Sequence, residues 1–178
     1  MKGQKVLFSK ASDEWETPQS LFDALDKEFK FDCDAAATDE NTKCKWYNTK
    51  EFSALNEENW CKTVGSNCHL KTFWLNPPYG QIAAFMKKAY EESLKGAIVV
   101  CLIPARTDTR YFHEYCMKAH EIRFIKGRLK FTNPTLGDKK LTSATFPSCI
   151  CIFNHKKYDK NNDPIMKVQE QHDRPAYI

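Results

Sequence analysis

The sequence has 178 residues, a length that favours one domain with a single hydrophobic core. Hydrophobic residues make up 42% and aromatic residues 13% of it, which argues against a disordered chain, and no stretch approaches the roughly 20 apolar residues of a membrane span. The formal net charge of +4 permits contact with nucleic acid but does not by itself indicate it.

The first predicted elements are a helix and two short strands. Residues 1–12 are polar and lack the apolar core of a signal peptide, so we expect a flexible N-terminus on a cytoplasmic protein. Thr17 can cap a helix whose first position suits Pro18, and apolar residues then recur on one face. Residues 31–36 and residues 70–75 each have the length and apolar content of a short strand.

The second half of the chain continues this alternation. The expected elements are a helix from residue 82, a strand at 97–103, a helix at 108–118, and strands at 121–131 and 146–153. Gly127 is expected to break the strand at 121–131 into two parts. Strands that alternate with helices predict an α/β fold with a mostly parallel sheet. Residues 155–178 show little periodicity and predict a polar C-terminal tail that is either loose or ordered only by a partner, which leaves one domain over residues 13–154.

The eight cysteines are predicted to be reduced. Several of them lie inside apolar runs, where a buried thiol behaves as a small hydrophobic group. Without a secretory signal, a disulfide framework is the weaker interpretation. A zinc site is also disfavoured because the sequence has no C-x2-C pair; its only candidate ligands would be Cys44, Cys61, Cys68 and His69.

The sharpest local signal is the segment Asn76-Pro77-Pro78-Tyr79, which directly follows the strand predicted at residues 70–75. Two consecutive prolines force an extended, rigid turn and have no N–H groups of their own. The carbonyl of Pro77 and the side-chain oxygen of Asn76 can therefore accept both protons of one amino group. Tyr79 offers a flat face on which an extruded base can stack. The simpler alternative is a proline turn in which Tyr79 only packs.

These acceptors suit methyl transfer to the amino group of adenine. The lone pair of that group is delocalised into the ring, and two hydrogen bonds to its protons make the nitrogen more pyramidal and more nucleophilic. They also stabilise the positive charge that grows as the methyl group arrives. Because Asn76 is neutral, we expect it to hold the amine rather than deprotonate it before attack. We therefore predict a catalytic segment of Asn76, Pro77, Pro78 and Tyr79.

Other short segments accompany this one in a fixed order. They are residues 15–19 (WETPQ), 31–36 (FDCDAA), Asn41 with Cys44 and Tyr47, 76–80 (NPPYG), 104–110 (PARTDTR), 127–129 (GRL) and 146–148 (FPS). Together they resemble the phage-type DNA N-6-adenine methyltransferases, a small Dam-like family. The resemblance implies an abbreviated Rossmann-like class I methyltransferase fold over residues 13–154, with a C-terminal antiparallel strand. It also implies S-adenosylmethionine as methyl donor, adenine in double-stranded DNA as substrate, and an origin in a phage or its bacterial host.

The same resemblance assigns residues to the cofactor. A helix that starts at Pro18 would offer backbone N–H groups to the carboxylate of its methionine end. Asp34 matches an acidic residue suited to the cofactor's ammonium group or to ordering the loop around it. The sequence departs from the family where relatives carry aspartates before a Gly-Leu pair, and there Glu51 is the candidate for contact with the adenine or ribose. The implied cofactor-binding set is Trp15, Thr17, Pro18, Asp34, Ala35, Ala36 and Asn76.

Basic residues gather in the second half of the chain. Arg106 and Arg110 flank a loop predicted to follow a strand end, near Asn76 by topology. Arg128 and Lys130 alternate with apolar residues, which gives a half-buried strand a basic face. Contacts with DNA phosphates are the functional interpretation of all four residues, and an ordinary solvated surface is the alternative.

Two other functions fit parts of the sequence. A methyltransferase acting on RNA or on a protein glutamine shares the Asn-Pro-Pro-Tyr motif, but such enzymes usually carry an extended glycine-rich cofactor motif that this sequence lacks. A decayed methyltransferase that only binds DNA is favoured by the alanines at 35–37, which resist positive φ more than glycines. Oligomeric state and DNA recognition sequence stay open; sequence preference is either loose or resides in residues 132–145.

Overall fold

The main sheet of the protein has seven strands. The structure is a computed structural model that describes residues 16–60, 71–132, 141–157 and 164–171. Its strands are β1 (Cys33–Asp34), β2 (Trp46–Tyr47), β3 (Thr72–Leu75), β4 (Ile98–Pro104), β5 (Glu121–Ile125), β8 (Ser148–Asn154) and β9 (Ile165–Gln169). They lie in the order β2-β1-β3-β4-β8-β5-β9, and among these described strands only β8 is antiparallel to its neighbours. The predicted Rossmann-like α/β fold with a mostly parallel sheet is therefore confirmed.

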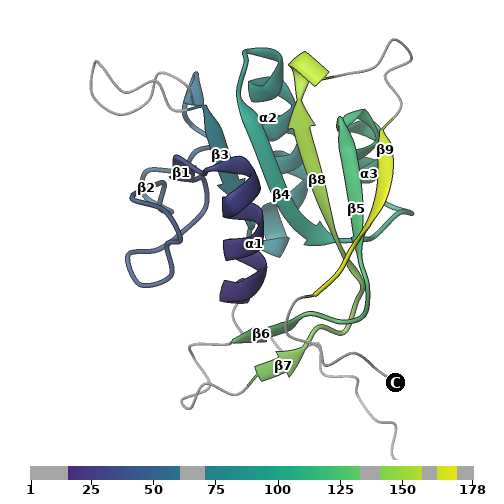
Figure 1. Cartoon of the computed structure of the whole chain (residues 1–178). Coiled ribbons are helices and arrows are strands. Elements are labelled where there is room, and N and C mark those ends of the chain that lie inside the picture. Colours follow the sequence, from purple (N-terminus) through teal and green to yellow (C-terminus); the bar gives the residue numbers. More distant parts are fainter. Residues whose placement is uncertain (1–15, 61–70, 133–140, 158–163, 172–178) are drawn as a thin grey trace, which may run out of the picture.

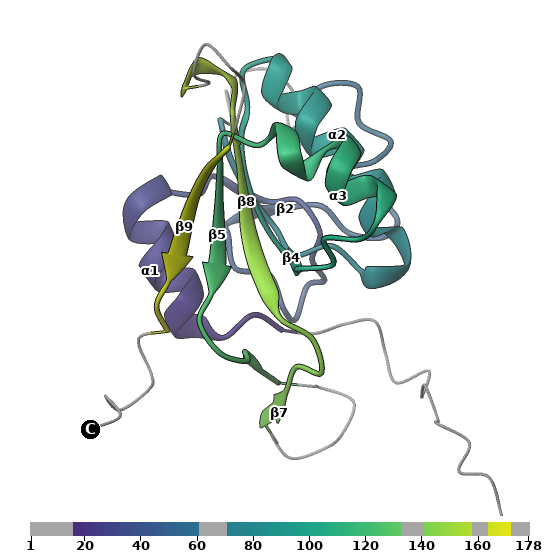
Figure 2. The same ribbon diagram turned by 90° about the vertical axis from the view of Figure 1, so that its right-hand side faces the viewer.

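Helices cover both faces of this sheet (Figure 2). On one face lies α1 (Gln19–Phe29), and on the other lie α2 (Ile82–Leu94) and α3 (Arg110–Glu114). The helix predicted at 108–118 is shorter than expected, because the backbone leaves the helical region at Tyr115 before a 3-10 turn at Cys116–Lys118. No helix among the described residues is both long and apolar enough to cross a membrane.

The alternation of side chains along β4 divides the core into two layers. Val100 and Leu102 belong to the layer under α1, whereas Val99, Cys101 and Ile103 belong to the layer under α2 and α3. Because β4 and its partners are covered on both faces, they read as continuous apolar runs. Five fully buried or nearly buried free thiols contribute to the second layer: Cys33, Cys101, Cys116, Cys149 and Cys151. Burial is therefore confirmed for these five cysteines, whereas their reduced state stays a prediction.

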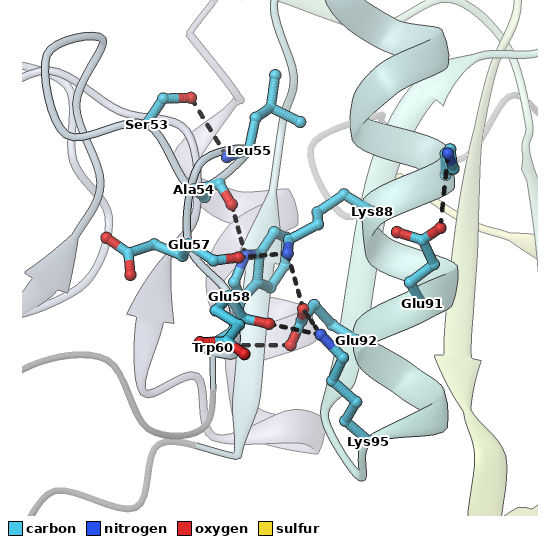
Figure 3. Close-up of polar contacts among 11 residues, drawn as sticks. Ser53, Ala54, Leu55, Glu57, Glu58, Trp60, Lys88, Glu91, Glu92 and Lys95 are labelled. Carbon is cyan, nitrogen blue, oxygen red and sulfur yellow. Dashed lines mark hydrogen bonds and ion pairs between the residues drawn. The ribbon is translucent and has the colours of Figure 1, made fainter.

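A buried charge cluster holds the connection between β2 and β3 against α2 (Figure 3). The fully buried Glu92 accepts a hydrogen bond of 2.9 Å from the backbone N–H of Trp60 and forms ion pairs with Lys88 at 2.9 Å and Lys95 at 2.8 Å. Both lysines also donate to backbone carbonyls of the connection, at Glu57 and Glu58. The part of this connection that is described, up to Trp60, has turns instead of a crossover helix, so these polar contacts fix its position.

The strand predicted at residues 121–131 is divided in two near Gly127, as predicted. Gly127, with φ at 80°, turns the chain away from β5, and the following strand β6 (Lys130–Thr132) pairs instead with β7 (Leu141–Ser143). These two strands form an antiparallel ribbon that lies below the main sheet in both views (Figures 1 and 2). The glycine accounts for the break, since a positive φ is costly for other residues.

The C-terminal segment is not wholly a tail. Residues 155–178 are expected to form a polar tail, but Ile165–Gln169 form strand β9, which pairs in parallel with β5 at the edge of the sheet. Lys167 on β9 forms an ion pair of 3.1 Å with Glu121 on β5. Glu121 also pairs with Arg123, which reaches Glu28 on α1 with two hydrogen bonds of 2.6 Å. A tail without secondary structure is therefore a wrong prediction for these five residues, whereas the domain boundaries stay a prediction.

Candidate active site

The carboxyl ends of the parallel strands bring the first two candidate residues together. Asp34 ends β1, and its register partner on β3 is Trp74, two residues before Asn76. The N–H of Ala35 donates to the carbonyl of Trp74 at 2.8 Å, which holds the loop after β1 against the end of β3. The chain runs from β1 outward to β2 and from β3 outward to β4, so its direction reverses between β1 and β3. Ligands of open α/β sheets bind beyond the carboxyl ends of the strands at such a point.

Asp34 orders the loop that follows it. Its side chain is 3% exposed, and its two carboxylate oxygens accept hydrogen bonds from the backbone N–H groups of Ala36 at 3.3 Å and Lys43 at 3.2 Å. Burial raises the pKa of Asp34 to about 6, although these two hydrogen bonds act in the opposite direction. Of the two roles expected for Asp34, the structure displays the ordering of the loop. Ala35 is buried and Ala36 half-buried in that loop.

The start of α1 lies beside this loop. The side chain of Lys43 donates to the side-chain oxygen of Gln19, the first residue of α1, at 2.9 Å. Pro18 precedes the helix and its carbonyl accepts the first helical hydrogen bonds from Leu21 and Phe22. The expected capping by Thr17 is wrong, since the residue before the helix is Pro18 and no side chain caps it. Thr17 is instead buried, and Trp15 lies outside the described residues.

The proline segment has the extended geometry expected from its sequence. Pro78 has φ at −59° and ψ at 134°, and the chain then enters a 3-10 turn at Tyr79–Gln81 that leads directly into α2. Pro77 is buried, and Asn76 and Tyr79 are half-buried. The segment thus joins β3 to α2 at the carboxyl edge of the sheet, as predicted. The roles of the Asn76 side chain and the Pro77 carbonyl as acceptors stay predictions.

An aromatic contact at this edge was not predicted from the sequence. The rings of Tyr79 and Phe146 meet edge to face, with centroids 5.3 Å apart, and the guanidinium of Arg106 lies 5.6 Å from the centroid of the Phe146 ring. Phe146 stands two residues before β8, and because β8 is antiparallel, its start lies at the carboxyl ends of the neighbouring strands. The backbone N–H of Ala105 also donates to the carbonyl of Pro147 at 2.9 Å, which joins the two segments. An aromatic residue at the start of the strand predicted at residues 146–153 was the available signal.

The four predicted DNA-binding residues are all exposed, but they lie in three places. Arg106 lies at the site itself, beside Phe146, while Arg110 forms an exposed ion pair of 3.1 Å with Glu114 on α3. Arg128 and Lys130 lie at the base of the β6–β7 ribbon. The structure therefore places one arginine against the candidate site and two cations on a neighbouring element.

Two further candidates gain no support. Glu51 is exposed in the loop after β2. Among the described residues no group of three or more histidines, cysteines or acidic residues is placed to hold a metal ion. Of the disfavoured zinc ligands, Cys44 is half-buried, and Cys61, Cys68 and His69 lie outside the described residues.

Comparisons with known proteins bear on this edge of the sheet. The chain is 36% identical over 118 residues to a DNA N-6-adenine-methyltransferase of Escherichia phage T1, a match that covers 66% of this chain and 46% of that protein. It is 33% identical over 148 residues to a DNA N-6-adenine-methyltransferase of Haemophilus phage HP1, covering 81% and 80% of the two chains. The chain thus spans about half the length of the first relative and most of the second. A family model described as DNA N-6-adenine-methyltransferase (Dam) matches residues 4–175, so the chain belongs to this family.

Proposed function

We propose that this protein transfers a methyl group from S-adenosylmethionine to the exocyclic amino group of adenine in double-stranded DNA. The observation that carries the proposal is the position of Asn76-Pro77-Pro78-Tyr79 at the carboxyl end of β3, next to Asp34 at the end of β1. This is the reversal point of the sheet, where a cofactor and a substrate can meet. The two phage relatives carry the name of this activity, which supports adenine in DNA over the RNA and protein alternatives.

The residues around Asp34 fit the cofactor in their chemistry. A buried carboxylate whose pKa is about 6 is a partner for an ammonium group at neutral pH, where it is ionised. The start of α1, which is tied to the same loop through Gln19, favours a carboxylate. We assign the methionine end of the cofactor to these two elements, with Thr17, Pro18, Ala35 and Ala36 around it. S-adenosylmethionine supplies an activated methyl group when bound there.

The protein's own part in the reaction is to hold and desolvate the adenine. Asn76 and the carbonyl of Pro77 accept the two protons of the amino group, which localises the lone pair on nitrogen and stabilises its growing positive charge. Tyr79 and Phe146, already in contact with each other, supply aromatic surface for the extruded base. Asn76 does not remove a proton before attack, because an amide is a very weak base. The expected rate gain comes from positioning and electrostatics.

The test is the variant Asn76→Ala in single-turnover transfer of labelled methyl groups to unmethylated duplex DNA, followed by nucleoside analysis. We expect a loss of roughly a hundred- to a thousandfold in the transfer rate, the usual effect of removing one such electrostatic partner. Binding of S-adenosylmethionine and the melting temperature should change little. Asn56→Ala, in an exposed loop, is the matched control and should retain the parent rate.

Three outcomes would count against the proposal in different ways. A folded Asn76→Ala variant with the parent rate would make Asn76 only a turn residue. A parent protein that methylates RNA or protein glutamine but not DNA would transfer the same chemistry to another substrate. A parent protein that binds no S-adenosylmethionine up to millimolar concentration would favour the decayed DNA-binding protein.

A further inference from the structure

The β6–β7 ribbon has one buried face and one exposed face. Leu129 and Ala144 are buried in the same cluster as the apolar side of α1, and the N–H of Ala144 donates to the carbonyl of Leu129 at 2.8 Å. The residues on either side of these two are exposed, and Lys130 is the register partner of Ser143. The exposed set, which we call the ribbon face, comprises Arg128, Lys130, Ser143 and Thr145.

The ribbon face begins directly at the candidate active site. Thr145 is followed by Phe146, whose ring meets Tyr79 at 5.3 Å and Arg106 at 5.6 Å. The apolar face of the ribbon base is anchored on α1, so its exposed face has a fixed relation to the edge of the sheet. When one part of a large ligand contacts Phe146 and Tyr79, the adjoining part of that ligand therefore lies next to the ribbon face.

The chemistry of the ribbon face matches duplex DNA. Its four side chains are two cations and two hydroxyl groups, with no carboxylate among them. Arginine and lysine bind phosphates and guanine edges, and hydroxyl groups bind either phosphates or bases. The two strands of a ribbon lie about 4.8 Å apart, so with side chains the element fits a major groove about 12 Å wide but not a minor groove about 6 Å wide. The exposed edge strand β9 offers a contrast, since it presents the apolar side chains of Ile165, Met166 and Val168 beside Lys167.

We propose that the ribbon face lies in the major groove beside the target adenine and sets the base preference of methylation at the neighbouring positions. The inference rests on the proposed function, because it takes duplex DNA as the substrate. It adds the element that reads the DNA and the groove that this element enters. Ser143 and Thr145 contact base edges or phosphates through their hydroxyl groups, and Arg128 and Lys130 combine base contacts with attraction to the backbone.

The experiment uses a pool of DNA duplexes that contain one adenine between randomised flanking base pairs. The pool is methylated with S-adenosylmethionine by the parent protein and, separately, by two double variants, and the methylated molecules are sequenced. The variants are Arg128→Ala/Lys130→Ala and Ser143→Ala/Thr145→Val. We expect the parent's preference among flanking bases to fall roughly 5- to 100-fold at one or more positions in each variant. The charge variant should also lose up to about two units of salt slope in DNA binding.

Two controls separate base reading from general effects. Lys27→Ala removes one exposed cation from α1 and should keep the parent's preference. Calorimetry should show unchanged binding of S-adenosylmethionine in every variant, and melting curves should confirm that each one folds.

The possible results divide cleanly. Loss of preference in the ribbon variants with intact cofactor binding supports the inference. A preference that survives in both variants, a parent without preference, or a uniform loss across all flanking bases would overturn it while leaving methylation of DNA in place. A parent that methylates no DNA in the pool would overturn the proposed function itself, and the inference with it.

Discussion

The two halves of the main sheet are stabilised by different kinds of interaction. Strands β4 and β8 pair over seven positions, from Ile98 with Asn154 to Pro104 with Ser148, and every residue of β8 is buried. Strands β1 and β2 pair over two positions only, and both residues of β2 are exposed. The half that contains β4 and β8 is held together by apolar packing. In the half that contains β1 and β2, most of the described residues lie in loops.

Individual polar side chains take the place of packing in the short-stranded half. Besides the two hydrogen bonds to Asp34, the side-chain oxygen of Asn41 accepts from the N–H of Thr38 at 2.7 Å. The hydroxyl of Thr42 donates to the carbonyl of Cys44 at 3.0 Å. Such local contacts hold a backbone in non-repetitive shapes that helices and strands cannot adopt. The apolar half therefore supplies stability, and the polar half supplies the shape of the loops at the candidate site.

The largest expected effect concerns stability. Phe153→Ala on β8 removes a fully buried ring that meets Tyr90 with centroids 6.3 Å apart, and it should lower the free energy of unfolding by about 3–5 kcal/mol. Trp46→Ala on β2 removes a larger ring that is 37% exposed at the sheet edge, and it should cost less than about 1 kcal/mol. Urea unfolding measures both. Equal shifts of the midpoint would erase the distinction between the two halves.

The same distinction explains what the sequence could predict. The apolar run at residues 97–103 predicts β4 to within one residue at each end, because burial on both faces leaves a continuous signal. The helical spacing after Ile82 predicts the start of α2. In contrast, Ile165–Gln169 gave no strand signal, since β9 is largely exposed and depends on backbone pairing with β5 and on Lys167 reaching Glu121. The spacing of apolar residues shows which side chains are buried, but it does not show which strand a segment pairs with.

The candidate site was predictable to the extent that it follows strand ends. Asp34 lies in the strand predicted at residues 31–36 and Asn76 follows the one predicted at 70–75, and the parallel sheet brings them to one edge. Phe146 was not assigned to the site, because its position there depends on the antiparallel direction of β8 between two parallel strands. The residues that order the loop after Asp34 were also out of reach, since hydrogen bonds such as that from Lys43 have no sequence period.

The second prediction concerns the polar half and its pH dependence. If Asp34 binds the ammonium group of the cofactor, its ionised form is the binding form, and burial raises the pKa of Asp34 to about 6 in the free protein. Affinity for S-adenosylmethionine should therefore be constant above that pH and fall up to about tenfold per pH unit below it. Asp34→Asn should bind roughly ten- to a hundredfold more weakly, with this pH dependence removed. Calorimetry between pH 5 and about pH 8 measures the affinity of the parent and of the variant. A parent affinity that does not change with pH would show that Asp34 does not bind the ammonium group of the cofactor.

The third prediction tests the aromatic contact that joins the segment after β3 to the segment before β8. Tyr79→Ala should weaken capture of the target base by roughly 1–3 kcal/mol, while Tyr79→Phe keeps the ring and most of the activity. Phe146→Leu keeps an apolar side chain but removes the edge-to-face contact and should have an intermediate effect. Single-turnover transfer over a range of DNA concentrations separates weaker capture from a slower chemical step. If Tyr79→Ala transfers at the parent rate at low DNA concentration, the ring serves packing alone.

The smallest expected effects come from two arginines that differ in their neighbours. Arg106 lies against Phe146 at the site, and Arg106→Ala should weaken DNA binding several-fold, leave cofactor binding unchanged and reduce the salt slope by about one.

Arg110 is also exposed, but its ion pair with Glu114 competes with any phosphate, so Arg110→Ala should change the slope less. Glu114→Gln sharpens the test, because removal of the competing carboxylate should strengthen DNA binding if Arg110 faces the backbone. DNA affinities at several salt concentrations distinguish these cases. An unchanged slope in Arg106→Ala would show that this arginine is an ordinary surface residue, and an unchanged affinity in Glu114→Gln would remove Arg110 from the DNA-binding surface.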